Sequence, residues 1–423
     1  MNVVIAALSA PAQLNGVSRH AANIARALLT TRSIATVHFL AGEWQQAMFR
    51  DVLQELDSRL HIHWISLADA NFSRLLWYFR ELPHIAAQLD ADVVHLAYPA
   101  PLRRKLFDCP TVLSLHDLYP FDIPENFGYW KSALARRTVR QCLRNVDAMA
   151  CVSASTHQRL AKLFPSAESK AAVIPNVVEA FPTRSAKCPH EQLAGRNFIL
   201  CVAQHRSNKN VPLVIQVFAH ALGMRILPAD TKLVVVGIPG PETKRIRDQL
   251  RKSGLGGMVL LFSGLSDEAL QWCYENCSAL LAPSKTEGFG LPVAEGMLSG
   301  CRIVCSDIPA FRELGGGGSC QFVPWEGDLV GSYTDALSRV LEFPKPPQLS
   351  LPQLSLAAVG RKYAVFYQNL IFSRVSGFDM LRQPETATKA VSQTGFPWSR
   401  RQLSLECHFR SSPDATRHGS GRK

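Results

Sequence analysis

Two glutamates and two glycines lie within nine residues of each other in the second half of the chain. They are Glu287, Gly288, Gly290 and Glu295, in the segment KTEGFGLPVAEG at 285–296. Glycine lets backbone amides approach a ligand closely, and a helix that starts near Pro292 would direct its positive end at an anion. The carboxylates could accept hydrogen bonds from sugar hydroxyls. The segment predicts a site for a phosphorylated, hydroxyl-rich ligand; the alternative is a glycine-rich turn with two solvated glutamates.

Three other segments carry groups that suit phosphate or sugar. Arg206 and Lys209 follow an apolar run, where they could neutralise a diphosphate, or form only an exposed basic turn. Gly16 separates the first apolar run from a helical pattern, which suits close approach of backbone to phosphate. His116 and Asp117 end the buried run of SLHDL, at an edge where sites form, although a lone histidine there is often structural.

Taken in order, these segments resemble glycosyltransferase family 4, whose members are retaining enzymes of the GT-B fold. The resemblance covers residues 1–342 and extends to about residue 372. Its most specific parts are EGFGLPVAE (287–295) and QHRSNKN (204–210). The supporting parts are VIPNVV (173–178), FSGLSDEAL (262–270), APSKTEG (282–288) and SDIPAFREL (306–314).

The resemblance implies a role for each predicted site residue in the second half. Arg206 and Lys209 neutralise the donor diphosphate, although Arg206 lies closer to the lysine than the family's arginine often does. Glu287 holds hydroxyls of the transferred sugar, and Glu295 holds the ribose. The backbone amides that face the sugar and phosphates belong to Phe289, Gly290 and Leu291.

Two residues of the first half complete the implied site. Gly16 brings its backbone to the diphosphate, in a loop that reads Asn15-Gly16 where many members have two glycines. His116 approaches the donor sugar. The basic residues and the helix N-terminus replace a metal ion in stabilising the leaving diphosphate, so no cofactor is expected.

We therefore expect transfer of a sugar, with retention, from a nucleoside-diphosphate sugar to a saccharide or lipid-linked saccharide. Bacterial surface polysaccharide assembly, meaning exopolysaccharide, O-antigen or lipopolysaccharide, is the expected setting. One alternative is a nucleotide-sugar epimerase of similar fold, which a donor-only assay would separate because it needs no acceptor. The other is an inactive glycosyltransferase-like binding protein.

The elements that must position these residues follow an α/β pattern. Apolar runs alternate with helical segments over residues 1–182, and the pattern restarts over 196–342 after a Pro- and Ser-containing break. This predicts two Rossmann-like, doubly wound domains facing each other across a cleft, the first on the acceptor side and the second binding the nucleotide sugar. We expect a helix over 355–372 to pack back toward the first domain, and residues 374–423 to form a disordered basic tail.

A net charge of +12 indicates an anionic partner, and no nucleic-acid motif accompanies it. The segment 130–145 predicts a helix with basic residues at 131, 137, 140 and 144 and apolar residues at 133, 134 and 143. We expect it to contact anionic lipid, the alternative being an ordinary solvated face. No apolar run is long enough to span a bilayer, so we expect a cytoplasmic protein on the inner face of the membrane. The 11 cysteines are expected to be reduced core residues.

Overall fold

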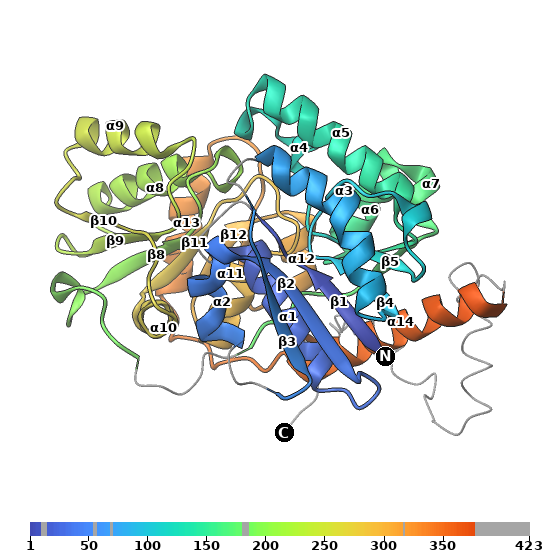
Figure 1. Cartoon of the computed structure of the whole chain (residues 1–423). Helices are drawn as coiled ribbons and strands as arrows, with labels where there is room; N and C mark the ends of the chain where they lie inside the picture. Colours follow the sequence, from blue (N-terminus) through green and yellow to red (C-terminus); the bar gives the residue numbers. More distant parts are fainter. Residues whose placement is uncertain (10–14, 54–56, 68–70, 180–185, 316–317, 377–423) are drawn as a thin grey trace, which may run out of the picture. The chain divides into compact units, whose positions relative to one another are not determined.

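The computed structural model describes residues 1–9, 15–53, 57–67, 71–179, 186–315 and 318–376. Two parallel sheets, both within one compact unit, account for the strands of this part of the chain (Figure 1). The tail expected over 374–423 lies outside the described residues from 377 onward, and its first three residues belong to the last helix instead. The two sheets correspond to the two halves of the sequence.

The first sheet has seven strands in the order β3-β2-β1-β4-β5-β6-β7. Its strands are β1 (Asn2–Ala6), β2 (Thr36–Gly42), β3 (Leu60–Ile65), β4 (Val93–Leu96), β5 (Thr111–Leu115), β6 (Ala148–Cys151) and β7 (Ala171–Val173). The helices between them are α1 (Gly16–Leu29), α2 (Gln46–Leu53), α3 (Asn71–Gln88), α4 (Tyr119–Asp122), α5 (Tyr129–Asn145), α6 (Ala154–Leu163) and α7 (Pro165–Glu168). The inner strands are buried on both faces, as their continuous apolar runs predict.

The second sheet has six strands in the order β10-β9-β8-β11-β12-β13. Its strands are β8 (Phe198–Val202), β9 (Lys232–Val236), β10 (Val259–Phe262), β11 (Ala279–Ala282), β12 (Ile303–Ser306) and β13 (Gln321–Val323). Its helices are α8 (Val211–Gly223), α9 (Thr243–Ser253), α10 (Asp267–Asn276), α11 (Leu291–Leu298), α12 (Pro309–Leu314) and α13 (Leu329–Leu341). Two apolar clusters, one involving α8 and α13 and the other α10 to α12, fill its two faces.

The strand order reverses once in each sheet, next to β1 in the first and next to β8 in the second. Loops that leave the carboxyl ends of strands at such a reversal diverge and leave a crevice, which is where ligands bind in this kind of sheet. The segments that follow β1, β8 and β11 carry Gly16, Lys209 and Glu287, and the loop after β5, which lies beyond β4 in the sheet, carries His116. The fold therefore brings the predicted site residues to the strand ends that suit binding.

The last helix, α14 (Leu356–Ser376), packs against α1 of the first domain (Figure 1). A side chain at Gly360 would start 2.0 Å from the Ala27 carbonyl oxygen, so glycine permits the close approach. The hydroxyl of Tyr367 in α14 lies 2.5 Å from Nδ1 of His95, inside the first domain. The interior of the first domain thus includes a segment from the far end of the sequence.

Candidate active site

Hydrogen bonds join the loop after β8 to the loop after β11. The Lys285 N–H donates to the Asn208 carbonyl at 2.7 Å, which fixes the two backbones side by side. Lys209 Nζ then donates to Glu287 Oε1 at 2.5 Å, and the two side chains are only 16% and 7% exposed. Two residues 78 positions apart in sequence therefore form a nearly buried ion pair at the strand ends. Such a pair is costly to break by removing one partner.

The start of α11 leaves backbone donors available beside this ion pair. Gly290 precedes the helix with φ +98, and a Cβ there would start 2.8 Å from the Phe311 ring. Only glycine adopts this backbone without strain in that space. The helix has no side-chain N-cap, so the amides near Phe289 and Leu291 keep their capacity to bind an anion.

The end of β5 in the first domain touches the β11 loop of the second. A Cβ at Gly288 would lie 1.8 Å from the carbonyl oxygen of His116. The Gly288 carbonyl accepts hydrogen bonds from the hydroxyls of Ser153 and Thr156, the latter at 3.0 Å. Glycine is required here because the two domains meet backbone to backbone.

His116 has the environment of a neutral imidazole. Its Nε2–H donates to the Ala97 carbonyl at 2.9 Å, and its ring meets the edge of the His20 ring at a centroid distance of 4.5 Å. Burial lowers the pKa of His116. A neutral ring with one nitrogen committed to a backbone carbonyl can orient a sugar hydroxyl without placing a positive charge there.

Asp117, which the sequence placed beside His116 but gave no role, and Tyr119, at the start of α4, also join the site. The Tyr119 hydroxyl lies 3.4 Å from Glu287 Oε2. Burial raises the pKa of Asp117 to about 6, whereas the Tyr119 N–H and the charges of Arg206 and Lys209 oppose the rise. Tyr119 was not identified from the sequence, because no motif marks it and its contact with Glu287 depends on how the two domains meet.

The other end of the cleft contains Gly16 and Glu295. Asn15 Oδ1 caps α1 by accepting from the Val17 and Ser18 N–H groups at 3.0 and 3.1 Å. A Cβ at Gly16 would lie 3.8 Å from Leu291, so the N-termini of α1 and α11 are neighbours. Glu295, one turn into α11, accepts from the Tyr274 hydroxyl at 2.7 Å.

The predicted residues thus fall into two groups along the cleft. Lys209, Glu287 and the β11 loop form one group with His116, and the charge of Arg206 acts on Asp117 next to it by lowering the pKa of that carboxyl. Gly16, Leu291 and Glu295 form the other. Cations and helix amides can hold a diphosphate between them, while the carboxylates can accept from hydroxyl groups at either end.

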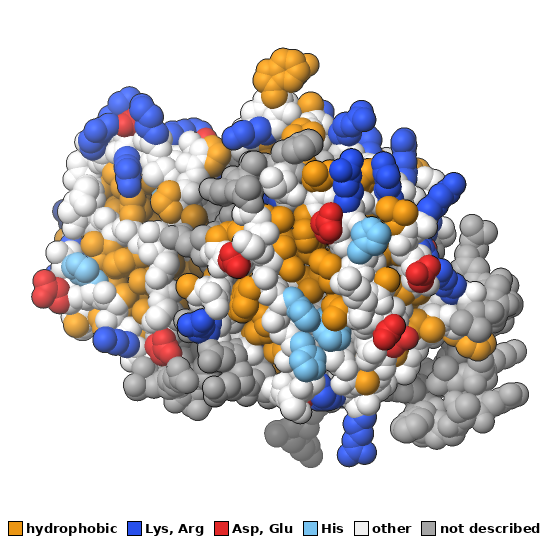
Figure 2. Space-filling view, in the orientation of Figure 1, with side chains coloured by type: hydrophobic (Ala, Val, Ile, Leu, Met, Phe, Trp, Pro, Cys, Tyr) orange, Lys and Arg blue, Asp and Glu red, His pale blue; other side chains and the backbone are white. Residues whose placement is uncertain are grey.

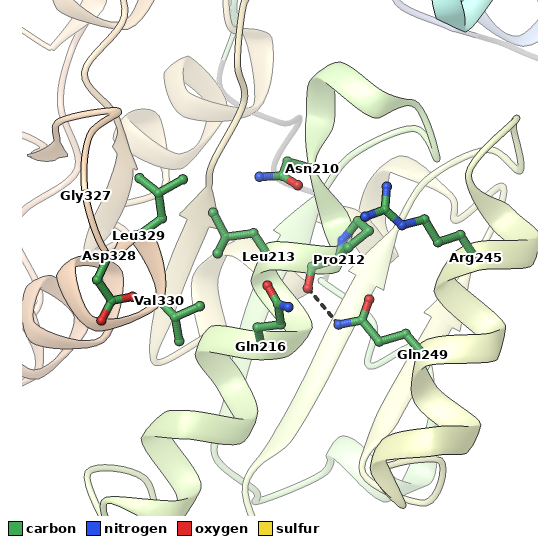
Figure 3. A pocket seen from close by; sticks show the side chains of 10 residues that line it. All are labelled: Asn210, Pro212, Leu213, Gln216, Arg245, Gln249, Gly327, Asp328, Leu329 and Val330. Carbon is green, nitrogen blue, oxygen red and sulfur yellow. Dashed lines mark hydrogen bonds between the residues drawn. The ribbon is translucent and has the colours of Figure 1, made fainter.

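Two other features lie apart from this cleft. A pocket of about 300 Å³ opens between α8, α9 and the start of α13, where Gln249 donates to the Pro212 carbonyl at 2.9 Å (Figure 3). The chain contains an Asp-x-Asp sequence, Asp90-Ala91-Asp92, but it precedes β4, at the opposite end of the strands from their carboxyl ends, and Asp92 Oδ2 accepts from the Asn2 N–H at 2.7 Å. Within the described residues no cluster of three acidic, histidine or cysteine side chains has metal-binding geometry.

Two family models match the chain, and they divide it as the two sheets do. The model described as Glycosyltransferase Family 4 matches residues 14–180. The model described as Glycosyl transferases group 1 matches residues 186–348. Together they include every residue predicted for the site.

Curated relatives match most of the chain in one case and part of it in others. O-antigen chain mannosyltransferase B of Escherichia coli is 22% identical over 79% of this chain and 89% of its own. O-antigen chain mannosyltransferase RfbU of Salmonella typhimurium is 24% identical over 54% of this chain and 62% of its own. The lipopolysaccharide core biosynthesis mannosyltransferase LpsB of Rhizobium meliloti is 30% identical over 29% of this chain and 35% of its own.

Solved structures share the fold at low identity. The crystal structure of WaaG, a glycosyltransferase involved in lipopolysaccharide biosynthesis, matches with a TM-score of 0.58 and 16% identity over 88% of this chain and 98% of that one. Anabaena HepE in complex with UDP and glucose matches with a TM-score of 0.57 and 14% identity over 92% and 99%. In both cases the match spans the two sheets together.

Proposed function

The chain belongs to glycosyltransferase family 4 and has the GT-B fold, and from this premise we propose that it transfers a sugar from a nucleoside-diphosphate sugar to a saccharide or lipid-linked saccharide, with retention. The observation that carries the proposal is the Lys209–Glu287 ion pair, which joins a phosphate-binding type of cation to a hydroxyl-binding carboxylate at the strand ends. Backbone amides at the start of α11 lie beside it. An enzyme that separates a sugar from a diphosphate needs both kinds of group in one place.

In the proposed reaction, the bond between the anomeric carbon and the diphosphate oxygen breaks and a bond to the acceptor oxygen forms on the same face of the sugar. The acceptor proton passes to the departing phosphate. Lys209, Arg206 and the α11 N-terminus stabilise the negative charge that develops on that phosphate, and Glu287 holds the sugar hydroxyls. His116 and Tyr119 border the sugar from the first domain.

Surface polysaccharide assembly is the setting we propose. Its support is that the three curated relatives described above are named as mannosyltransferases of O-antigen or of the lipopolysaccharide core. A nucleoside-diphosphate mannose is accordingly the donor that we expect to bind most tightly. The same reasoning makes a growing saccharide on a lipid carrier the expected acceptor.

Donor binding is tested by thermal unfolding of the chain with UDP-, GDP-, ADP- and dTDP-sugars, each in the presence of EDTA. A donor at 100 times its Kd should raise the free energy of unfolding by about 2.7 kcal/mol. We expect one mannosyl donor to produce the largest shift and the shift to survive EDTA, because lysine, arginine and helix amides contact the diphosphate. A shift that disappears with EDTA and returns with a divalent ion would contradict the metal-free site, and no shift with any donor would contradict the proposal itself.

We also propose that α5 docks the enzyme on anionic lipid. Its first two residues, Tyr129 and Trp130, are 80% and 82% exposed. Lys131, Arg137, Arg140 and Arg144 are exposed along the same helix, and Lys and Arg side chains gather at the top of the view where α5 lies (Figure 2). Aromatic rings suit the bilayer interface and basic residues its negative surface. Within the described residues no helix is long and apolar enough to cross a bilayer.

The exposed face of α5 differs in one respect from the sequence prediction. Leu143, expected to add to the apolar component, is 3% exposed and packs in the first domain's core. The apolar part of the surface instead lies at the start of the helix, where Leu134 is 54% exposed. Arg136 donates to the Pro120 carbonyl at 2.6 Å, which connects α5 to α4, the short helix that begins at Tyr119.

Changing Arg137, Arg140 and Arg144 together to glutamine should weaken binding to phosphatidylglycerol-containing vesicles at least about tenfold, because each basic residue near the surface contributes ~1 kcal/mol. Cosedimentation at low salt measures this. The matched control changes Arg245, Arg247 and Arg251 of α9, which removes the same charge from another exposed helix. Equal losses in the two triple variants, or full binding by the α5 variant, would refute docking through α5.

A further inference from the structure

An ion pair joins the two domains at the Glu295 end of the cleft. Arg19 of α1 donates through Nη2 to Asp267 Oδ1 at 2.7 Å and through Nη1 to Asp267 Oδ2 at 3.2 Å. The two side chains are 33% and 41% exposed. Two parallel hydrogen bonds fix the guanidinium plane, as a single lysine contact could not.

Folding stability does not account for this pair. Ion pairs with this exposure contribute about 0–1 kcal/mol to stability. The same helix carries a second pair, Arg26 with Glu179 at 3.1 Å, whose side chains are 31% and 37% exposed. The two pairs are therefore similar in exposure, but only the Arg19 pair is bidentate and only Arg19 lies at the cleft.

Helix α10 links Arg19 to Glu295, the carboxylate expected to hold the nucleotide. Burial raises the pKa of Glu295, and the Tyr274 hydroxyl and the charge of Arg19 act in the opposite direction. Tyr274 and Asp267 both belong to α10, two turns apart, so one helix contacts Glu295 and also anchors Arg19. Arg19 follows Gly16 by less than one turn of α1, and Gly16 in turn faces Leu291 at the start of α11.

We propose that Arg19 is a positioning residue for the donor: anchored by Asp267, it holds the first domain against the second at the nucleotide end of the cleft. The proposal rests on the proposed function, because it takes the donor to be a nucleotide sugar. Arg19 acts far from the bond that breaks, so its removal weakens donor binding and leaves the chemical step largely unchanged. The same reasoning assigns Asp267 to the positioning of Arg19.

The experiment compares the parent with Arg19→Ala, Arg19→Lys, Asp267→Asn and the matched control Arg26→Ala. Isothermal titration with the nucleoside diphosphates gives Kd, and donor kinetics give KM and kcat. We expect Arg19→Ala to raise Kd and KM by up to about fivefold with kcat within about twofold, the change in binding that loss of an ion pair of about 1 kcal/mol supports. Arg19→Lys should recover part of the loss, Asp267→Asn should reproduce part of it, and Arg26→Ala should match the parent.

Thermal unfolding of all four variants separates positioning from folding, since the two arginine-to-alanine variants should lose similar, small amounts of stability. Parent-like Kd and KM in Arg19→Ala would overturn the positioning role while leaving the proposed function intact. The role is equally overturned if Arg26→Ala weakens binding as much as Arg19→Ala. A parent chain that binds no nucleoside diphosphate would reject the proposed function, and the role of Arg19 with it.

Discussion

Glu287→Ala is expected to lower kcat by about 100- to 1,000-fold, the range seen when a group that stabilises the transition state is removed. Glu287 lies where the β11 loop meets Lys209 and the Tyr119 hydroxyl, so it is the carboxylate placed to hold the moving sugar. Its removal also leaves the Lys209 ammonium, only 16% exposed, without that carboxylate. Steady-state kinetics with the donor identified by thermal unfolding would measure the change.

Two variants separate the role of Glu287 from a general disturbance of the site. Glu287→Gln keeps the shape and a hydrogen-bond acceptor, and should retain more activity than alanine. Glu295→Ala should show the opposite pattern, a raised Kd for the free nucleoside diphosphate with a smaller change in kcat, because the ribose is remote from the reaction. Equal binding of the free nucleotide by both alanine variants would show that Glu287 and Glu295 do not have these separate roles.

Gly288→Ala is expected to reduce kcat/KM at least about 100-fold, because displacements of about 1 Å in an active site can have effects of this size. The new Cβ would start 1.8 Å from the His116 carbonyl oxygen and 2.9 Å from its carbon. These neighbours are backbone atoms at the end of β5, so neither can rotate away. The β11 loop and the first domain must therefore separate, which moves Glu287 away from Tyr119.

Gly256→Ala is the matched control for this substitution. Gly256 lies in the turn before β10, has no positive φ, and a Cβ there would meet nothing within 4 Å. It should have parent-like kinetics and should unfold at a similar or slightly higher temperature. If Gly288→Ala were as active as Gly256→Ala, the backbone contact between the domains would not be required for catalysis.

The fold could be predicted where apolar runs were long and clearly bounded. The runs at 111–115, 232–236, 259–262 and 279–282 predict strands with the bounds that β5, β9, β10 and β11 have. β7 and β13 could not be predicted in this way. Each has three residues at an outer edge of its sheet, too few to show a period, and each is recognised only by its pairing with the strand before it in sequence.

The candidate site could be predicted only in part, for a related reason. Lys209, Glu287 and Gly290 stand in loops whose local sequence already suits phosphate and sugar. Their partners depend on how distant loops meet, so Tyr119 beside Glu287 and Arg19 beside Glu295 were not apparent from spacing. Leu143 shows the same limit on a helix. An apolar residue can face either the protein core or a membrane surface, and only the packing of the folded chain shows that Leu143 faces the core.

The return of α14 to α1 bears on how this enzyme can be recombined with its relatives. A chimera that joins one protein's first domain to another's second domain near residue 186 would take α14 from the wrong parent. The Tyr367 hydroxyl at His95, and the close approach of Gly360 to Ala27, would then depend on foreign side chains. An exchange of specificity between such proteins keeps the first domain's core intact only if residues 356–376 come from the same parent as residues 1–179. The functional unit of exchange is discontinuous in sequence.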